Sequence, residues 1–184
     1  MLQKYLDEAG MAMEKVYVSM QGAFSKINIG RATPALIQDI KVEYYDNLVP
    51  VSQLATISTS DAQTLVVQPW ESRAIVGIEK AIQESQLGLA TRNDGRMIMV
   101  TVPKPSEERR RILVKLMKSE GEKAKVMIRN IRRDYKELMR SLPKDGIAES
   151  EIKRLEKKIQ QLTDDYNDKV AQFVQLKEAD LMNV

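Results

Sequence analysis

The sequence predicts an α+β fold: a long antiparallel three-helix bundle into which a small β-rich (β/α/β) domain is inserted. Apolar residues recur at the helical spacing of three and four positions near residues 2–28, 104–140 and 152–176. Between 31 and 104 the pattern changes to the alternation of strands, interrupted by one short helical interval. Three long amphipathic helices need one another to bury their apolar sides, and the strand-rich segment lies between the first and the second.

The first helical segment extends to about Asn28. Its apolar positions alternate in steps of four and three, as in a heptad seam: Leu2, Leu6, Ala9, Met13, Val16, Met20, Phe24 and Ile27. Gly30 ends the helix, and Ala32-Thr33-Pro34 follows as a break.

The inserted segment of about 75 residues reads as short strands around one helix. Alternation at 40–44, short extended pieces at 48–51 and 54–57, and apolar runs at 64–68 and 97–102 predict strands. Polar residues predict turns at 58–61 and 93–95. The interval 72–86 suits a single amphipathic helix.

The second long helix has two stripes with the same period. Ser106 is placed to cap this helix. Glu107 and Glu108 lie in its first turn, where negative charge interacts favourably with the helix dipole. Its apolar stripe is Leu113, Leu116, Met117, Ala124, Met127, Ile128, Ile131, Tyr135 and Leu138. Its cationic stripe, roughly half a turn away, is Arg111, Lys115, Lys118, Lys125, Arg129, Arg132, Lys136 and Arg140. Gly121 inside this helix should cost about 1 kcal/mol relative to alanine.

The positive charge of the chain is concentrated in this one segment. Residues 104–140 hold 13 Lys and Arg against 6 Asp and Glu, a local net charge of +7 in a chain whose total is +3. A charged helix face is usually only solvated. Here, however, like charges repel along a helix of roughly 50 Å. Such a rod suits a linear polyanion, and arginine pairs bidentately with phosphate oxygens.

The predicted boundaries divide the chain into a discontinuous bundle, residues 1–30 and 105–184, and an inserted domain, residues 31–104. A turn near 142–146 separates the second helix from the third, whose apolar positions run from Ile152 to Leu176. Two segments cross between bundle and insert, near 30–31 and near 103–105. A double connection of this kind resists twisting but allows bending, which predicts a hinge.

Composition argues against catalysis. The chain has no Cys and no His, so it lacks disulfides, thiolate zinc sites and the commonest general acid or base near neutral pH. We expect no catalytic residues, no metal and no cofactor. No apolar run approaches the ~20 residues that span a bilayer, and the start does not resemble a targeting segment, which predicts a cytoplasmic protein. Asp164, Asp165 and Asp168 are expected to form a solvated acidic face, and Tyr44, Tyr45 and Trp70 to pack within the small domain.

Several short sequence motifs occur together, in one order, along essentially the whole chain. They are Gly30-Arg31-Ala32-Thr33-Pro34, Val42-Glu43-Tyr44-Tyr45, Gln53-Leu54-Ala55, Pro69-Trp70-Glu71, Ser106-Glu107-Glu108-Arg109-Arg110 and Ile128-Arg129-Asn130-Ile131-Arg132-Arg133-Asp134. In these motifs the chain resembles the bacterial ribosome recycling factor family. It departs from the family at Asn28-Ile29, at Asp46-Asn47, where a glycine turn is usual, and at Gln63.

The resemblance implies an L shape comparable to a tRNA, and binding between the ribosomal subunits after termination, mainly to large-subunit rRNA. With elongation factor G and GTP, such proteins split the spent ribosome. The expected rRNA contacts centre on Arg129 and Arg132 and comprise Arg129, Arg132, Arg133, Lys125, Lys118, Lys136 and Arg140. The expected hinge residues are Gly30, Arg31, Pro103, Lys104 and Pro105. We expect a monomer whose seams are satisfied internally.

Two other classes of protein fit part of the pattern. A helical nucleic-acid-binding protein that acts on DNA or free RNA would also use a cationic helix. A structural coiled-coil protein would use the apolar seams to oligomerise. An enzyme is the third and most distant alternative.

Overall fold

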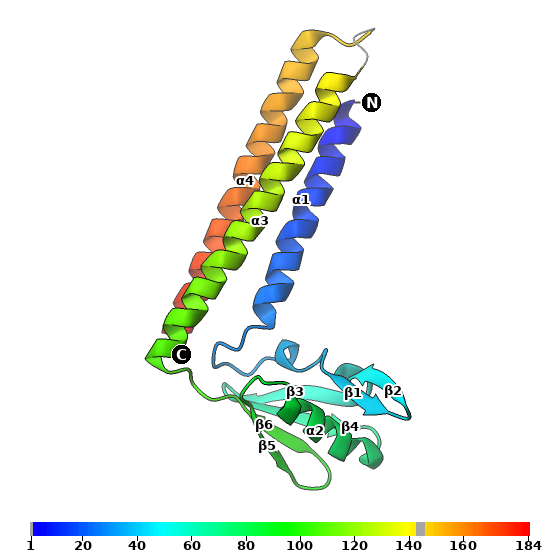
Figure 1. Cartoon of the computed structure of the whole chain (residues 1–184), viewed down its shortest axis with the longest axis vertical. Coiled ribbons are helices and arrows are strands. Elements are labelled where there is room, and N and C mark those ends of the chain that lie inside the picture. Colours follow the sequence, from blue (N-terminus) through cyan, green and yellow to red (C-terminus); the bar gives the residue numbers. More distant parts are fainter. Residues whose placement is uncertain (1, 143–145) are drawn as a thin grey trace. The chain divides into compact units, whose positions relative to one another are not determined.

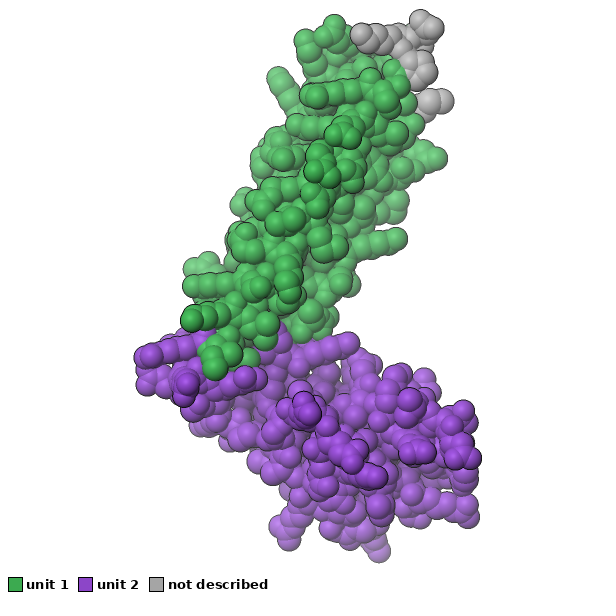
Figure 2. Space-filling view, in the orientation of Figure 1, with its two compact units in different colours: residues 1–24, 112–180 green, residues 25–111, 181–184 purple. Residues whose placement is uncertain are grey.

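The computed structural model describes residues 2–142 and 146–184. The chain divides into two compact units, shown in different colours in Figure 2. The first comprises Met1–Phe24 and Ile112–Asp180, and the second comprises Ser25–Arg111 and Leu181–Val184. Each unit has hydrophobic clusters of its own. None of the helices in the described ranges is long and apolar enough to cross a membrane.

Three long helices, α1 (Leu2–Ser25), α3 (Glu107–Ser141) and α4 (Glu149–Met182), form the first unit and lie side by side in Figure 1. Contacts between side chains give their directions. Arg140 pairs with Glu156, whereas Gly121, earlier on α3, approaches Val174, later on α4. Helices α3 and α4 are therefore antiparallel. Tyr166 and Phe173 of α4 meet Glu14 and Phe24 of α1 in the same chain order, so α1 and α4 are parallel.

The apolar side of α3 is narrower than its sequence suggests. Ile128 is fully buried, but Leu116, Met127 and Leu138, which were expected on the seam, are 41%, 53% and 41% exposed. The buried line runs instead along Leu113, Met117, Gly121, Ala124, Ile128 and Met139. At 100° per residue, Met127 lies a quarter turn from Ile128, outside the sector that faces the other two helices.

Gly121 marks a close approach rather than a break in the helix. Helix α3 is continuous from Glu107 to Ser141, and Gly121 is one of its buried residues. A Cβ atom built on Gly121 would lie 2.7 Å from Cγ2 of Val174. The helix therefore carries glycine here because the side chain of Val174 occupies that space.

The second unit is built on two antiparallel sheets. The smaller pairs β1 (Lys41–Tyr44) with β2 (Asn47–Pro50). The larger has the order β3-β4-β6-β5, with bounds Ala55–Asp61, Thr64–Pro69, Ile98–Thr101 and Ala90–Asn93. Its buried face packs with α2 (Ile75–Glu84) and with a single-turn 3-10 helix, Pro34–Leu36. Two further 3-10 turns are Val51–Gln53 and Ser72–Ala74.

Two details of the second unit differ from the sequence prediction. The expected turn at 58–61 is instead the second half of β3, and the chain reverses between Asp61 and Thr64. Strand β5 was not predicted at all. Both segments are polar because they supply edge strands whose side chains are largely exposed. Ser and Thr there lack the apolar alternation that reveals a half-buried strand.

The aromatic residues of the second unit are only partly packed. Tyr44 contacts the hydrophobic core, and its hydroxyl pairs with Glu71. Tyr45 and Trp70, in contrast, are 64% and 65% exposed, so the expectation that they pack inside the domain was wrong for these two. Tyr45 lies in the turn between β1 and β2 at a φ of 47°, and its exposed ring packs edge-on against the ring of Tyr44, with 4.5 Å between the two centroids.

Candidate nucleic-acid interface

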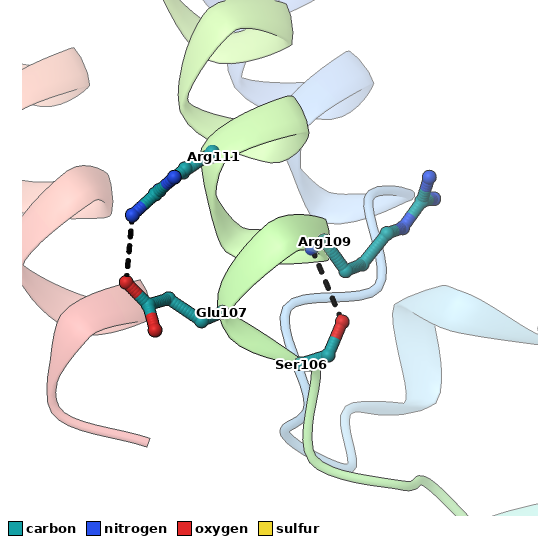
Figure 3. A network of polar contacts seen from close by, with 4 residues as sticks. All are labelled: Ser106, Glu107, Arg109 and Arg111. Atoms are coloured by element: carbon teal, nitrogen blue, oxygen red, sulfur yellow. Dashed lines mark hydrogen bonds and ion pairs between the residues drawn. The ribbon is translucent and has the colours of Figure 1, made fainter.

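The basic helix begins where the sequence predicted. Ser106 Oγ accepts a hydrogen bond from the main-chain N of Arg109 at 3.2 Å, which caps the first turn (Figure 3). One turn further, Glu107 pairs with Arg111 at 2.8 Å. Arg111, at the start of the cationic stripe, is therefore already neutralised locally, and the uncompensated part of the stripe begins later along α3.

All seven expected contact residues lie on α3. Four are exposed, namely Lys118, Arg129, Arg133 and Arg140, and three are partly buried, namely Lys125, Lys136 and Arg132. At 100° per residue six of them, and more loosely Arg133, fall on one flank of α3. The contacts of Arg132 with Gln160 and of Arg140 with Glu156 show that α4 borders this flank.

The seven cations differ in how far their charge is compensated. Lys125 has Glu122 at 3.7 Å and Arg133 has Asp134 at 3.5 Å. These two ion pairs are long and at least partly exposed to water, so they compensate the charges of Lys125 and Arg133 only weakly. Within the described part of the chain, the side chains of Lys118 and Arg129 form no hydrogen bond or ion pair. Their charges remain available to a partner.

Arg140 is the most strongly compensated member of the stripe. Its Nε donates to Glu156 Oε1 at 2.7 Å. This hydrogen bond from Arg140 is the main reason why the pKa of Glu156 is lowered, and the same bond raises the pKa of Arg140. Both groups therefore stay charged and largely cancel each other, so Arg140 offers less to an outside anion than its position in the sequence suggests.

Arg132 has a different neighbour on α4. Its Nη1 donates to the side-chain oxygen of Gln160 at 3.1 Å, and the amide of Gln160 donates in turn to Asp164 at 3.0 Å. An amide carries no net charge, so the positive charge of Arg132 is retained. Gln160 and Glu156 could not be predicted from the sequence, because the pairing of α4 with α3 depends on a helix register that a single sequence does not reveal.

A groove of about 360 Å³ lies between α3 and α4 beside the start of the uncompensated stripe. Lys118 and Lys125 line it, but so do Glu122 and Glu178. Its mixed charge makes it a poor pocket for a single anion. The exposed row of cations along α3, rather than this groove, is the surface suited to phosphates.

Among the described residues, no group of His, Cys, Asp or Glu side chains could hold a metal ion. Asp164 and Asp165 instead accept hydrogen bonds from glutamines one turn earlier on α4. The arrangement of cations on α3 is suited to binding an anionic partner through charge. It brings no nucleophile to a base.

The chain is similar in sequence to one family of known proteins. The sequence profile of the family described as "Ribosome recycling factor" matches residues 20–182. A ribosome-recycling factor from Amoebophilus asiaticus is 46% identical over 183 residues, covering 100% of this chain and 98% of that protein. Another, from Halalkalibacterium halodurans, is 42% identical over 185 residues, covering all of both chains.

Two solved structures are similar over nearly the whole chain. A solution structure of the ribosome recycling factor has a TM-score of 0.78 at 40% identity, covering 100% of this chain and 98% of the other. The second structure describes the T. thermophilus ribosome recycling factor and E. coli elongation factor G bound to the E. coli post-termination complex. It has a TM-score of 0.68 at 38% identity and covers 98% of both chains. By sequence along its full length and by fold, this chain belongs to the ribosome recycling factor family.

Proposed function

We propose that this protein binds the post-termination ribosome and, together with elongation factor G and GTP, promotes its dissociation into subunits for a new round of translation. The observation that carries the proposal is the full-length relationship to ribosome recycling factors. One similar structure contains such a factor with elongation factor G on the post-termination complex. As a member of this family the protein is a translation factor and not an enzyme.

The binding surface in this proposal is the cationic flank of α3, and its partner is rRNA of the large subunit. Arg129 and Lys118 support it because they are exposed and uncompensated, and Arg132 because its neighbour on α4 is neutral. Phosphate contacts of this kind supply affinity that falls steeply with salt. Lys125, Arg133 and Arg140 flank these three residues and contribute less, because nearby acids compensate them. Lys136 lies on the same flank and contributes as well.

The mechanical part of the proposal places a hinge at the two segments that contain Gly30, Arg31, Pro103, Lys104 and Pro105. Gly30 has a φ of 87°, and a Cβ atom there would lie 2.5 Å from Cδ of Pro105. The two segments therefore pack against each other within the second unit and would act as one joint. GTP hydrolysis by the elongation factor would supply the force, and the protein would work as a monomer in the cytoplasm.

Breakdown of polysomes tests the proposed function directly. Polysomes stripped of nascent chains are incubated with purified elongation factor G and GTP, with and without the protein, and then separated on a sucrose gradient. We expect free subunits to increase only when all three are present. A control without the elongation factor shows whether the protein acts with the GTPase. An unchanged gradient in the complete mixture would refute the proposal.

A further inference from the structure

Arg132 donates a hydrogen bond to Gln160 of α4, and Gln160 is in turn held by Asp164 of the same helix. Arg132 Nη1 donates to Gln160 Oε1 at 3.1 Å, and Gln160 Nε2 donates to Asp164 Oδ1 at 3.0 Å. A guanidinium has only donors and an ionised carboxylate has only acceptors, so the amide between them satisfies both in one orientation only. The oxygen of Gln160 is therefore fixed toward Arg132.

This arrangement orients Arg132 without cancelling its charge. One N–H of the guanidinium is used by the amide, which leaves the others for an outside acceptor. Arg132 is also partly buried, unlike Arg129 on the same flank. A long side chain that is already held loses less conformational freedom when it binds. The contrast is Arg140, whose partner on α4 is the carboxylate of Glu156.

We propose that Gln160, itself oriented by Asp164, is a positioning residue that presents the Arg132 guanidinium to a phosphate group of rRNA and keeps its positive charge uncompensated. The proposal rests on the proposed function, in which α3 binds the large subunit. It adds a residue of α4 to the binding surface, and it explains why the neighbour of Arg132 is an amide while the neighbour of Arg140 is an acid.

The next residue of α4 provides a matched control. Gln161 Nε2 donates to Asp165 Oδ1 at 2.9 Å, which repeats the spacing and chemistry of the pair formed by Gln160 and Asp164. Gln161 is exposed, and within the described ranges its side chain has no hydrogen bond to α3. Gln160→Glu and Gln161→Glu therefore change the net charge equally and disturb equivalent pairs, but only the first meets Arg132.

The experiment measures the affinity of the purified protein for isolated large ribosomal subunits over a range of salt concentrations. Gln160→Glu gives Arg132 a carboxylate partner, as Arg140 has already, so the fold is retained. We expect its affinity to fall about tenfold, the size of one charge-assisted contact. The slope of log affinity against log salt should become shallower by about 1. Gln161→Glu should change the affinity less than about threefold.

A second variant separates orientation from charge. Gln160→Met keeps a long side chain but removes the acceptor, so Arg132 keeps its charge and loses its support. We expect a loss of affinity of about threefold, smaller than the loss for Gln160→Glu, with an unchanged salt slope. Because this variant adds no charge near the RNA, it keeps the proposal testable even if Gln160→Glu alters folding, which a melting curve of each variant reveals.

Both glutamate variants are also measured in a protein that carries Arg132→Gln, which shows whether Gln160 acts through Arg132. There, Gln160→Glu should cost no more affinity than Gln161→Glu, since the residue through which it acts is gone. Equal losses for the two glutamate variants in the wild-type background would overturn the positioning role. So would a loss for Gln160→Glu that persists without Arg132. Wild-type affinity of Arg132→Gln itself would instead contradict the role of α3 in the proposed function.

Discussion

At the scale of single residues, the cations of the stripe on α3 differ in whether an acidic side chain already compensates their charge. The side chain of Arg129 forms no hydrogen bond or ion pair within the described chain, whereas Arg140 pairs with Glu156 at 2.7 Å. In the proposed function, a phosphate would compete for Arg140 with a carboxylate already in place, whereas the exposed side chain of Arg129 would be available to it. Arg129 and Arg140 therefore differ in how available their charges are to a partner, although both are arginines on the same flank of α3.

We predict that Arg129→Gln lowers the affinity for large ribosomal subunits about tenfold because it removes an available charge. The matched variant replaces both members of the compensated pair, Arg140→Gln with Glu156→Gln, and should leave affinity within about threefold of wild type. Filter binding at constant salt measures both. A loss for the double variant as large as that for Arg129→Gln would show that the pair is open when the protein is bound.

Tyr166 links the stability of the helical unit to alkaline pH. Burial, and then a hydrogen bond to Glu14 at 2.7 Å, raises the pKa of Tyr166 from its ordinary value of 10.0 to about 12. The folded state thus holds this proton more tightly than the unfolded state does. The resulting stability is fully present below pH 10 and is lost as the pH rises toward 12.

We predict that unfolding free energy falls between pH 9 and pH 11 by about 1 kcal/mol more in the wild type than in Tyr166→Phe, which has no phenolic proton to lose. Urea denaturation at each pH measures the difference between the two proteins. Other tyrosines and lysines titrate in both proteins and cancel in the comparison. Parallel curves for wild type and variant would show that Tyr166 is not the group responsible.

At the scale of elements, helix α3 shows why a stripe of apolar residues does not define a buried face. Ile128 is fully buried and its neighbour Met127 is 53% exposed, although the sequence placed both on the seam. A periodic pattern gives the direction of the apolar side. Its width depends on where α1 and α4 lie, and that is decided by packing.

We predict that Ile128→Ala lowers the unfolding free energy by about 2–5 kcal/mol, because it leaves a cavity in the bundle. Met127→Ala should change it by less than about 0.5 kcal/mol, since its side chain is largely in water already. Thermal or urea denaturation of both variants makes the comparison. Similar losses for the two would mean that the buried line of α3 is wider than described.

The close contact at Gly121 gives a second prediction at this scale. Gly121→Ala raises helix propensity by about 1 kcal/mol, but the added methyl group meets Val174 Cγ2 at 2.7 Å. Val174 is β-branched and has little freedom to rotate away. We expect a net destabilisation of about 1–3 kcal/mol.

Val174→Ala in the same chain should recover most of that loss, because it vacates the space that the new methyl group needs. The control is Val174→Ala alone, which measures the cost of removing the valine side chain. A Gly121→Ala variant more stable than wild type would show that α3 and α4 separate easily at this point.

At the scale of the whole molecule, the apolar positions of the three long helices are buried within one chain. This burial favours a monomeric translation factor over a structural protein that oligomerises as a coiled coil. Met13 of α1, Ile128 of α3 and Ile159 of α4 are each fully buried within a single copy. In the described residues, the three helices bury these positions against one another within one chain, so the helices have little reason to associate with a second chain.

We predict that sedimentation gives the mass of one chain, 21.0 kDa, over a range of protein concentrations. Duplex DNA should compete poorly with large ribosomal subunits at the same salt, because the cations on α3 supply only part of a specific RNA contact. A concentration-dependent mass would favour an oligomeric coiled coil. Equal competition by DNA would favour a general nucleic-acid-binding protein.

Much of the fold was predictable from the sequence, because its signals are local. Helical periodicity, the Ser106 cap and the switch to alternation predicted three long helices around a strand-rich insert, and the structure has them. The edge strands β3 and β5 were only partly predicted or missed. Their exposed polar residues resemble those of turns, and only pairing with the neighbouring strands β4 and β6 makes them strands.

The order of the residues is enough to predict that one long helix carries the positive charge, because both the charges and the helical period are read directly from it. Which of those charges remain available depends on how the helices pack. Arg132 meets an amide and Arg140 meets a carboxylate because α4 lies antiparallel to α3 in one particular register. That register results from the packing of Gly121 against Val174 and of the buried apolar residues around them, which no local pattern encodes.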